Sequence, residues 1–188
     1  MILTKTFDDG VTRCGWLNED PIYRDYHDQE WGTKTTGQAA LFEGICLEGF
    51  QAGLSWLTIL KRREGFRNAF HGFDVARVAA MNDSDVEVLM QDSSIIRNRA
   101  KINSAIRNAQ LVLDQNIDLT KLLWSFAPRV SLTPAEDFAW RATSSESDAM
   151  SKRLRELGFG FVGSTTMYAL MQSTGMIQDH APGCFRRP

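Results

Sequence analysis

The sequence predicts an all-α fold, and three observations carry that prediction. Residues typical of helix starts recur along the chain, apolar residues repeat at helical spacing, and strand signals are poor. No run of β-branched residues alternates with polar ones, and no Asn-Gly pair marks a tight hairpin. We therefore expect roughly eight to ten short helices joined by turns.

The first elements follow from the residues that begin and end them. Asp20 followed by Pro21 is an N-cap and first-turn pair, and Gly32 closes that segment. Residues 41–56 are apolar enough to form a buried helix. We expect residues 1–12, ahead of these elements, to form a flexible tail, and residues 13–188 to form one domain.

Two later helices are predicted from the residues of their first turns. Ser84 and Glu87 have the spacing of a capping box, in which each side chain satisfies a free backbone donor. Ser145 and Asp148 have the same spacing. Each pair predicts the N-terminus of a helix.

Three further segments complete the prediction. Residues 95–113 place one apolar stripe on a helix, and residues 164–172 predict another helix. The stripe consists of Ile95, Ile102, Ile106, Ala109 and Leu113. Residues 128–143, with Pro128 and Pro134, are the least regular part, which we expect to be a loop or a connection between lobes.

The composition excludes several classes of protein. No stretch of about 18 apolar residues occurs, so the sequence predicts no membrane span. The N-terminus lacks the apolar core of a secretory signal, and three cysteines, an odd number, argue against a disulfide framework. We expect a monomer in a reducing cytoplasm.

The charge pattern leaves nucleic-acid binding open. The net charge of −2 counts mildly against it, because such domains are often basic. The basic residues nevertheless gather in two clusters, although a solvated helix face is the simpler interpretation of each. The clusters are Lys61, Arg62, Arg63 and Arg67, and Arg97, Arg99, Lys101 and Arg107.

Glu48 is the most informative single residue. It stands among apolar and small residues in the second half of the predicted helix over residues 41–56. A buried carboxylate needs hydrogen-bond donors or a cationic partner, and aromatic residues are frequent nearby. An acceptor among aromatic rings suits a pocket for a flat, donor-bearing, positively charged ring such as a modified nucleobase. The simpler interpretation is a core acid paired with an arginine.

Metal-type ligands fall in two pairs near opposite ends of the chain. Cys14 and His27 form the first pair, and His180 and Cys184 form the second, in a tight turn with proline and glycine. Two cysteines and two histidines make a standard closed zinc site, which is structural and not catalytic. Ordinary core or surface roles are an equally good interpretation of the spacing alone.

A glycine-rich stretch over residues 157–166 joins two predicted helices. Gly163, Ser164 and Thr165 begin the second helix, where free backbone N–H groups form a ready anion site. A helix-hairpin-helix that grips a DNA phosphate has this geometry. A plain helix–helix turn is the alternative.

Five motifs in order carry a resemblance to a known family. They are Cys14-Gly15-Trp16, residues 27–32, residues 46–56, residues 95–102 and residues 180–184. Over residues 13–185 the chain resembles the 3-methyladenine DNA glycosylase I family, bacterial members of the helix-hairpin-helix glycosylase superfamily. The chain departs from the family pattern in its ten or so additional N-terminal residues, and in Gly160, where similar proteins often carry a basic residue.

The resemblance implies a bilobal, all-α enzyme with two interleaved lobes that removes 3-methyladenine from alkylated double-stranded DNA and leaves an abasic site. It implies that Glu48, Tyr26 and Trp56 form the base pocket, with Trp16 and Trp31 close to it. It also implies a structural zinc on Cys14, His27, His180 and Cys184, which would join the N- and C-terminal segments. DNA phosphates would contact Arg97, Arg99, Lys101 and the hairpin residues Gly163, Ser164 and Thr165.

The chemistry of the substrate agrees with this set of residues. Methylation at N3 makes adenine cationic, so its bond to the sugar is already weak and the base leaves neutral. Aromatic faces favour such a cation by about 0.5–2 kcal/mol per contact, and an ionised Glu48 accepts hydrogen bonds from the exocyclic amine. Two rivals remain: a metal-dependent hydrolase, which needs an open coordination position on zinc, and a non-enzymatic alkylated-DNA-binding protein on the same fold.

Overall fold

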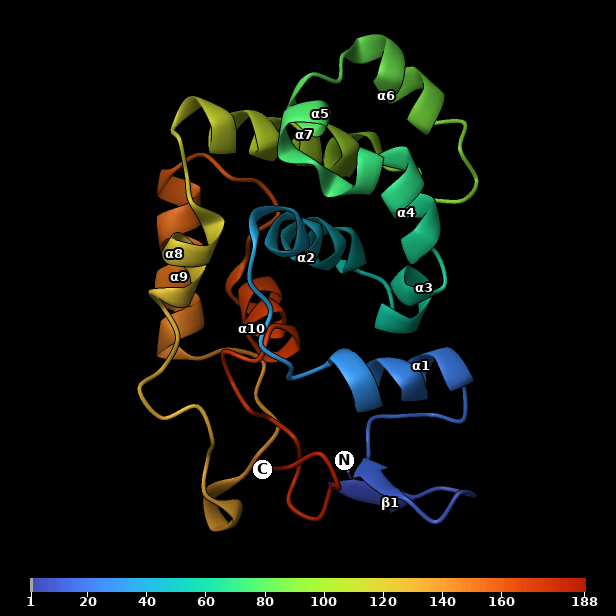
Figure 1. Ribbon diagram of the computed structural model, residues 1–188, viewed down its shortest axis with the longest axis vertical. Helices are drawn as coiled ribbons and strands as arrows, with labels where there is room; N and C mark the ends of the chain where they lie inside the picture. Colours follow the sequence, from blue (N-terminus) through green and yellow to red (C-terminus); the bar gives the residue numbers. More distant parts are fainter. Residues whose placement is uncertain (1) are drawn as a thin grey trace.

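The computed structural model describes residues 2–188, and it is predominantly helical (Figure 1). The ten α-helices of this part are α1 (Pro21–Asp25), α2 (Gln38–Gln51), α3 (Trp56–Leu60), α4 (Arg63–Ala69), α5 (Val75–Ala79), α6 (Asp83–Leu89), α7 (Arg99–Asp114), α8 (Leu119–Trp124), α9 (Ser145–Glu156) and α10 (Ser164–Ser173). A π-helical turn, η1 (Tyr26–Glu30), extends α1, and two 3-10 turns are η2 (His71–Phe73) and η3 (Ala135–Asp137). The expectation of a mainly helical chain is confirmed.

Helix α2 is the centre of the molecule and is surrounded by other helices (Figure 1). Eight of its residues are buried, including Phe42, Ile45 and Phe50 in the main hydrophobic core. Helix α10 packs closely against it, because a Cβ atom at Gly44 would lie 2.7 Å from a methyl carbon of Leu170. A residue in the middle of α2 is therefore enclosed from several sides at once.

The apolar run over residues 41–56 is divided between two helices. Helix α2 ends at Gln51, a turn follows with Gly53 at φ 83°, and the Ser55 side chain accepts from the Thr58 N–H to begin α3. Trp56 therefore starts a new helix and does not continue that of Glu48. Apolar content alone did not reveal this break, which depends on a local cap.

Two predicted caps are wrong, by two residues in α6 and by one residue in α9. Asn82 and Asp85 form the capping box of α6, and Ser144 and Ser147 form that of α9. Asp20 is the N-cap of α1 with Pro21 in its first turn, as predicted. Several candidate caps within a few residues compete, and the tertiary structure selects one of them.

The apolar stripe of residues 95–113 lies mostly on α7, which begins later than predicted. Asn98 is its N-cap, so Ile95 is buried ahead of the helix and not within it. Ile102, Ile106 and Ala109 are buried as expected, whereas Leu113 is 48% exposed near the end of the helix.

The segment expected to be a flexible tail contains an antiparallel hairpin. Strand β1 (Thr4–Thr6) pairs with β2 (Thr12–Cys14), and the Arg13 side chain bridges Asp9 and Asp28 at 2.8 and 2.7 Å. Residues 4–12 are therefore paired to the rest of the fold. The two chain ends lie near each other at the bottom of Figure 1, where the Phe185 N–H donates to the carbonyl of Thr12.

Residues 128–143 are irregular, as expected, with only η3 and a single bridge from Leu132 to Gln178. The C-terminal segment holds this stretch in place, because the Gln178 N–H donates to the Ser131 carbonyl at 2.8 Å. The Arg187 guanidinium donates to the carbonyl of Thr133. The stretch is irregular in backbone but anchored.

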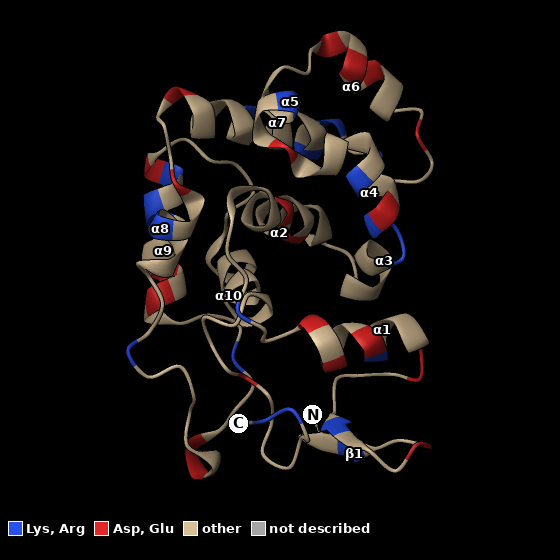
Figure 2. Ribbon diagram, viewed as in Figure 1, with Lys and Arg blue, Asp and Glu red and all other residues tan. Residues whose placement is uncertain are grey.

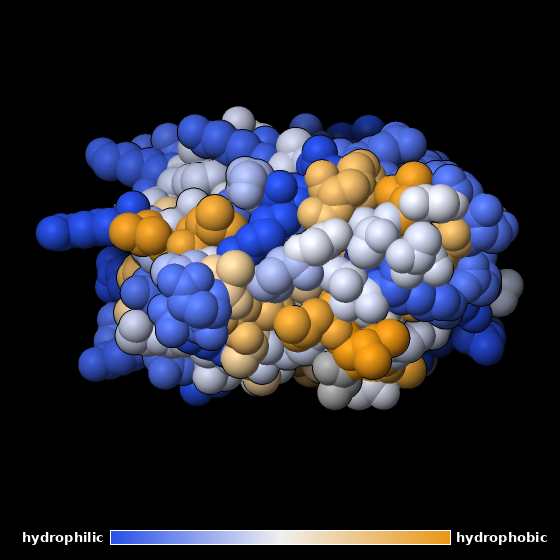
Figure 3. Space-filling model, turned by 90° about the horizontal axis from the view of Figure 1, so that it is seen from below, coloured by the Kyte–Doolittle hydropathy of each residue, from blue (hydrophilic) through white to orange (hydrophobic). Residues whose placement is uncertain are grey.

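The surface carries mixed charge with few large apolar areas. Acidic residues mark α6, and basic residues lie on α4 and between α3 and α4 (Figure 2). Seen from below, hydrophobic residues gather in several separate patches among hydrophilic ones (Figure 3). Within residues 2–188 no helix is both long enough and apolar enough to cross a membrane.

Candidate active site and metal centre

A cavity of about 270 Å³ opens between α1, α2, α3 and α10. Aromatic rings form most of its wall, and Glu48 is its one acid. The lining residues are Trp16, Tyr23, Tyr26, Trp31, Glu48, Gln51, Trp56, Trp140, Arg141, Ala169 and Gln172. All five predicted pocket residues are therefore brought together at one cavity, although their positions span forty residues of sequence.

Glu48 projects from α2 and is only 3% exposed. Its Oε1 accepts from the Ser173 hydroxyl at 3.5 Å, and its Oε2 has no hydrogen-bond partner in the described part of the chain. Burial therefore raises the pKa of Glu48 to about 8. The expected cationic or donor-rich partner is not supplied by residues 2–188, which leaves the carboxyl group available to a ligand.

A second cavity, of about 290 Å³, is bordered by some of the same residues. Both cavities are lined by Tyr26, Glu48 and Trp56. The second one also reaches Ser173 and the Arg63–Glu30 ion pair, whose atoms are 2.6 Å apart. Glu48 thus borders two cavities.

The aromatic wall places its rings near the carboxyl group. The Tyr26 and Trp56 rings lie 5.6 Å apart at 51°, so they present faces that are not parallel. Burial, with a contribution from the charge of Glu48, raises the pKa of Tyr23 to about 12 and that of Tyr26 well above its ordinary value. Both phenols therefore stay neutral at physiological pH.

The π-helical turn η1 divides two functions between consecutive residues. The Trp31 N–H donates to the Tyr26 carbonyl at 2.9 Å, five residues back, which widens the helix at this point. Tyr26 lines the cavity and His27 joins the metal-type cluster, and both are buried. The widened turn sends adjacent side chains to two different sites.

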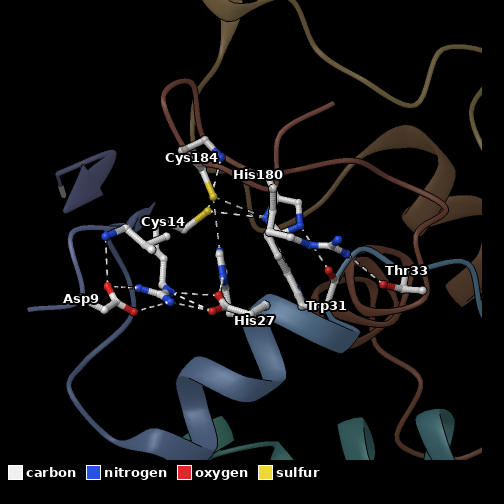
Figure 4. A network of polar contacts seen from close by, with 12 residues as sticks. Asp9, Cys14, His27, Trp31, Thr33, His180 and Cys184 are labelled. Atoms are coloured by element: carbon white, nitrogen blue, oxygen red, sulfur yellow. Dashed lines mark hydrogen bonds and ion pairs between the residues drawn. The ribbon is translucent and has the colours of Figure 1, made fainter. Parts of the chain in front are cut away.

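Cys14, His27, His180 and Cys184 meet in one buried cluster (Figure 4). Their ligand atoms all lie within 4.8 Å of one another. The Cys184 Sγ atom is 3.5 Å from His27 Nε2 and 3.9 Å from His180 Nδ1, and Cys14 Sγ is 3.8 Å from His180 Nδ1. Two sulfur and two nitrogen ligands around one zinc ion would be separated by about 3.5 Å, so the arrangement fits such an ion.

The remaining polar atoms of the cluster are also fixed. His27 Nδ1 lies 2.8 Å from an Asp28 carboxylate oxygen, and His180 Nε2 lies 3.1 Å from the Trp31 carbonyl. Metal-binding histidines are usually held in this way through their second nitrogen. A hydrogen bond between the two thiols raises the pKa of Cys14 and lowers that of Cys184.

Trp16 and Trp31 connect the cluster to the cavity. The Trp16 ring lies 5.2 Å from that of Trp31 and 5.5 Å from that of His27. The Trp31 ring lies 4.6 Å from that of His180. The same two indoles line the cavity, so the cluster holds one of its walls in place.

The three basic residues predicted to contact DNA have different environments. Lys101 is 8% exposed, and its ammonium donates to the carbonyls of Phe50 and Ala52 at 2.8 and 2.6 Å. It therefore caps the end of α2 and does not face a ligand. Arg99 forms a two-point ion pair with Glu87, whereas Arg97 is exposed without an ion pair among the described residues.

The hairpin before α10 has the predicted helix start, with Gly163 as N-cap. The Ser164 hydroxyl is already occupied, because it donates to Asp148 and lies 3.0 Å from the Ser147 hydroxyl. Thr165 is exposed. Arg155 lies beside this start, and a Cβ atom at Gly163 would be 3.6 Å from its guanidinium, a proximity that the sequence pattern did not suggest.

Gly160 lies close to α7. A Cβ atom there would lie 2.3 Å from the Ser104 hydroxyl on α7. The Gly160 N–H donates to the Asn108 side chain at 2.9 Å, and that side chain donates back to the Gly160 carbonyl at 3.2 Å. These two hydrogen bonds attach the hairpin to α7.

Six cavity residues were absent from the predicted site: Tyr23, Gln51, Trp140, Arg141, Ala169 and Gln172. Tyr23 lies on α1, three residues before Tyr26, so helical periodicity could have added it. Gln172 is oriented by Asp179, which accepts from it at 2.8 Å and from Tyr168 at 2.6 Å. Trp140 and Arg141 lie in the irregular stretch, where the sequence carries no positional signal.

Comparison with known proteins gives a consistent set of relatives. A family model described as methyladenine glycosylase matches residues 16–187. DNA-3-methyladenine glycosylase 1 of Escherichia coli is 50% identical over 179 residues, which cover 93% of this chain and 96% of that protein. DNA-3-methyladenine glycosylase of Haemophilus influenzae is 46% identical, with 93% and 97% covered.

Two solved structures have the same arrangement. A crystal structure of 3-methyladenine DNA glycosylase I superposes with a TM-score of 0.88 at 46% identity, covering 94% of this chain and all of that one. The structure of a Staphylococcus aureus 3-methyladenine DNA glycosylase I, solved to show how it recognises 3-methyladenine, has a TM-score of 0.85 at 32% identity, with 94% and 96% covered.

Proposed function

The chain belongs to the methyladenine glycosylase family, and from that premise we propose how its residues release 3-methyladenine from DNA. It is a DNA repair enzyme that hydrolyses the bond between 3-methyladenine and the sugar in alkylated DNA. A merely DNA-binding role, the alternative weighed from the sequence, is disfavoured by these relatives. We take residues 13–188 as its single working domain, acting as a monomer.

Glu48 is the residue that recognises the base. The unpartnered Oε2 in the aromatic cavity is the single observation that carries this assignment. The exocyclic amine of adenine offers the donor that the carboxylate lacks, and a charge-assisted hydrogen bond is roughly twice as strong as a neutral one. A base inside the duplex cannot reach this cavity, so the nucleotide is extruded at a cost of a few kcal/mol.

The positive charge of the methylated base selects it from normal adenine. Burial opposes ionisation of Glu48 in the free protein, so the carboxylate forms most readily when a cation is beside it. Tyr26 and Trp56 add cation–π attraction of about 0.5–2 kcal/mol each. A neutral base receives neither contribution.

Cleavage of the bond between the base and the sugar then needs little stabilisation of the leaving group. The methylated base leaves neutral, so no residue has to protonate it, and a water molecule attacks the sugar carbon. Electrostatic complementarity to the bound cation and the exclusion of bulk water position the substrate.

The four-residue cluster holds a structural zinc ion in this proposal. Its donor set, the ligand separations and the fixed second nitrogens of both histidines support the assignment. Zinc bound by four protein ligands has no open position, so it would join the N- and C-terminal segments and support the Trp16–Trp31 wall. The metal-dependent hydrolase rival requires that missing position.

Backbone contacts to DNA are assigned to the α9–hairpin–α10 unit, as a helix-hairpin-helix. The start of α10 at Gly163 to Thr165 supplies N–H groups, and Arg155 supplies a positive charge beside them. Arg97, exposed near the start of α7, is a further candidate. Lys101 and Arg99 are not retained, because carbonyls and Glu87 engage them.

The decisive test is release of free 3-methyladenine from methylated duplex DNA. Wild-type protein should release it, and Glu48→Gln should reduce single-turnover excision by about 100-fold, because the charged acceptor is lost while its shape is kept. Glu43→Gln, on the same helix but paired with Arg67, is the matched control and should excise normally. Excision at wild-type rates by Glu48→Gln would remove Glu48 from the recognition role.

A further inference from the structure

The irregular segment after η3 contributes one wall of the aromatic cavity. Trp140 and Arg141 line it together with Glu48, although about ninety residues separate them in sequence. We call residues 138–141 the strap. Phe138 and Trp140 also pack against the buried group that contains Tyr26 and Trp31.

The strap is held by ring packing and by the C-terminal segment. The Phe138 and Trp140 rings are perpendicular with centroids 5.0 Å apart, and the Arg187 guanidinium lies 5.6 Å from the Phe138 ring centroid. Arg187 also donates to the His180 carbonyl at 2.6 Å. The strap is therefore tied to the segment that carries half of the metal-type cluster.

The indole of Trp140 carries an unused donor. Its Nε1 atom is buried without an acceptor anywhere in residues 2–188, which a folded protein ordinarily avoids because an unmet buried donor is destabilising. The unpartnered acceptor Glu48 Oε2 belongs to the same cavity. A ligand that offers an acceptor beside a donor would satisfy both.

Adenine has such an edge, and guanine does not. Adenine places a ring-nitrogen acceptor next to an amine donor, whereas guanine places two acceptors, N7 and O6, on the corresponding edge. An indole N–H and a carboxylate therefore match adenine, and the carboxylate repels O6 of guanine.

The positive charge of Arg141 makes it unsuited to bind the cationic base itself. It is exposed and forms no ion pair in the described part of the chain, yet it borders a cavity that receives a cation. A guanidinium at that rim repels the methylated ring and attracts the phosphate attached to the same extruded nucleotide.

We propose that the strap contacts the extruded nucleotide, with the Trp140 N–H donating to a ring nitrogen of the base and Arg141 binding the adjacent phosphate. This inference rests on the proposed function and adds a specificity residue and a phosphate contact to it. The two roles separate cleanly, because free 3-methyladenine has no phosphate and an abasic duplex has no base.

The experiment compares Trp140→Phe and Arg141→Gln in two binding assays. Trp140→Phe should weaken binding of free 3-methyladenine about fivefold, as expected for one neutral hydrogen bond, and leave binding of a duplex with a tetrahydrofuran abasic analogue nearly unchanged. Arg141→Gln should leave binding of the free base unchanged and lower the salt dependence of duplex binding by about 0.9 in the slope of log K against log salt.

Matched controls are Trp124→Phe, whose indole already donates to the Thr35 carbonyl, and Arg129→Gln, from the same irregular stretch outside the cavity. Both should bind like the wild type. Circular dichroism melting checks that the strap variants are folded.

Wild-type binding of the free base by Trp140→Phe, or an unchanged salt slope for Arg141→Gln, would overturn the corresponding half of the proposal. Equal losses by both variants in both assays would also overturn it, because that result indicates a general structural role. If the wild-type chain itself releases no 3-methyladenine from methylated DNA, the proposed function fails, and that failure is separate from any behaviour of the strap.

Discussion

The metal-type cluster and the aromatic cavity are neighbours with opposite hydrogen-bonding states. Around the cluster, both histidines are held through their second nitrogens, by Asp28 and by the Trp31 carbonyl. Around the cavity, Glu48 Oε2 and the indole nitrogens of Trp56 and Trp140 have no partner among residues 2–188. A satisfied site preserves a shape, whereas a site with unmet polar atoms is prepared to bind.

Removing a ligand from the cluster should have the largest effect. We expect His180→Ala to lose bound zinc and to unfold at temperatures where the wild type is folded, since metal-binding energy is folding energy at such sites. Metal analysis of the purified protein and thermal melting measure this. His71→Ala, an exposed histidine outside the cluster, should keep both properties. Full stability of metal-free His180→Ala would contradict the structural role.

Neutralising Glu48, the cavity acid with an unpartnered oxygen, should instead increase stability. The pKa of Glu48 is raised from 4.5 to about 8 by burial, so its stabilising contribution is complete below pH 4.5 and is lost as pH rises through 8. Glu48→Gln should therefore unfold with a free energy on the order of 4 kcal/mol above the wild type at pH 9, and equal to it near pH 4. Denaturant titrations at the two pH values measure the difference. If the variant and the wild type are equally stable at both pH values, Glu48 is exposed to water.

Excision should depend on pH through the same group. The cationic base needs an ionised Glu48, and the free carboxyl has a pKa of about 8, so binding below pH 8 has to release a proton. We expect kcat/KM to fall about tenfold per pH unit below 8 and to level off above it. Glu48→Gln should give a flat profile over that range. A wild-type profile that is flat from pH 6 to 9 would disprove the link.

The smallest effect tests the wall that the two sites share. Trp31→Leu removes a ring 4.6 Å from that of His180 and also removes part of the cavity lining. We expect about a tenfold loss of affinity for 3-methyladenine and a modest fall in melting temperature, since an aromatic contact contributes about 0.5–1.5 kcal/mol beyond its burial. Isothermal titration and melting curves report the two effects. If only one of them changes, the sites are independent.

The sequence predicted the two sites better than their surroundings. The four cluster residues and Glu48 stand out because cysteine, histidine and a lone acid are rare among apolar neighbours. The sequence was less informative for Lys101, because it does not show where a long side chain ends, here on the carbonyls at the end of α2. Trp140 and Arg141 were missed because no periodicity marks an irregular stretch that tertiary contacts alone hold in place.

The position of Glu48 at two cavities has a consequence for its charge. When a base fills the aromatic cavity, the second cavity, of about 290 Å³, still borders the same residue. The ionisation of the acid is therefore set by two environments, the bound base and the residues that line the second cavity.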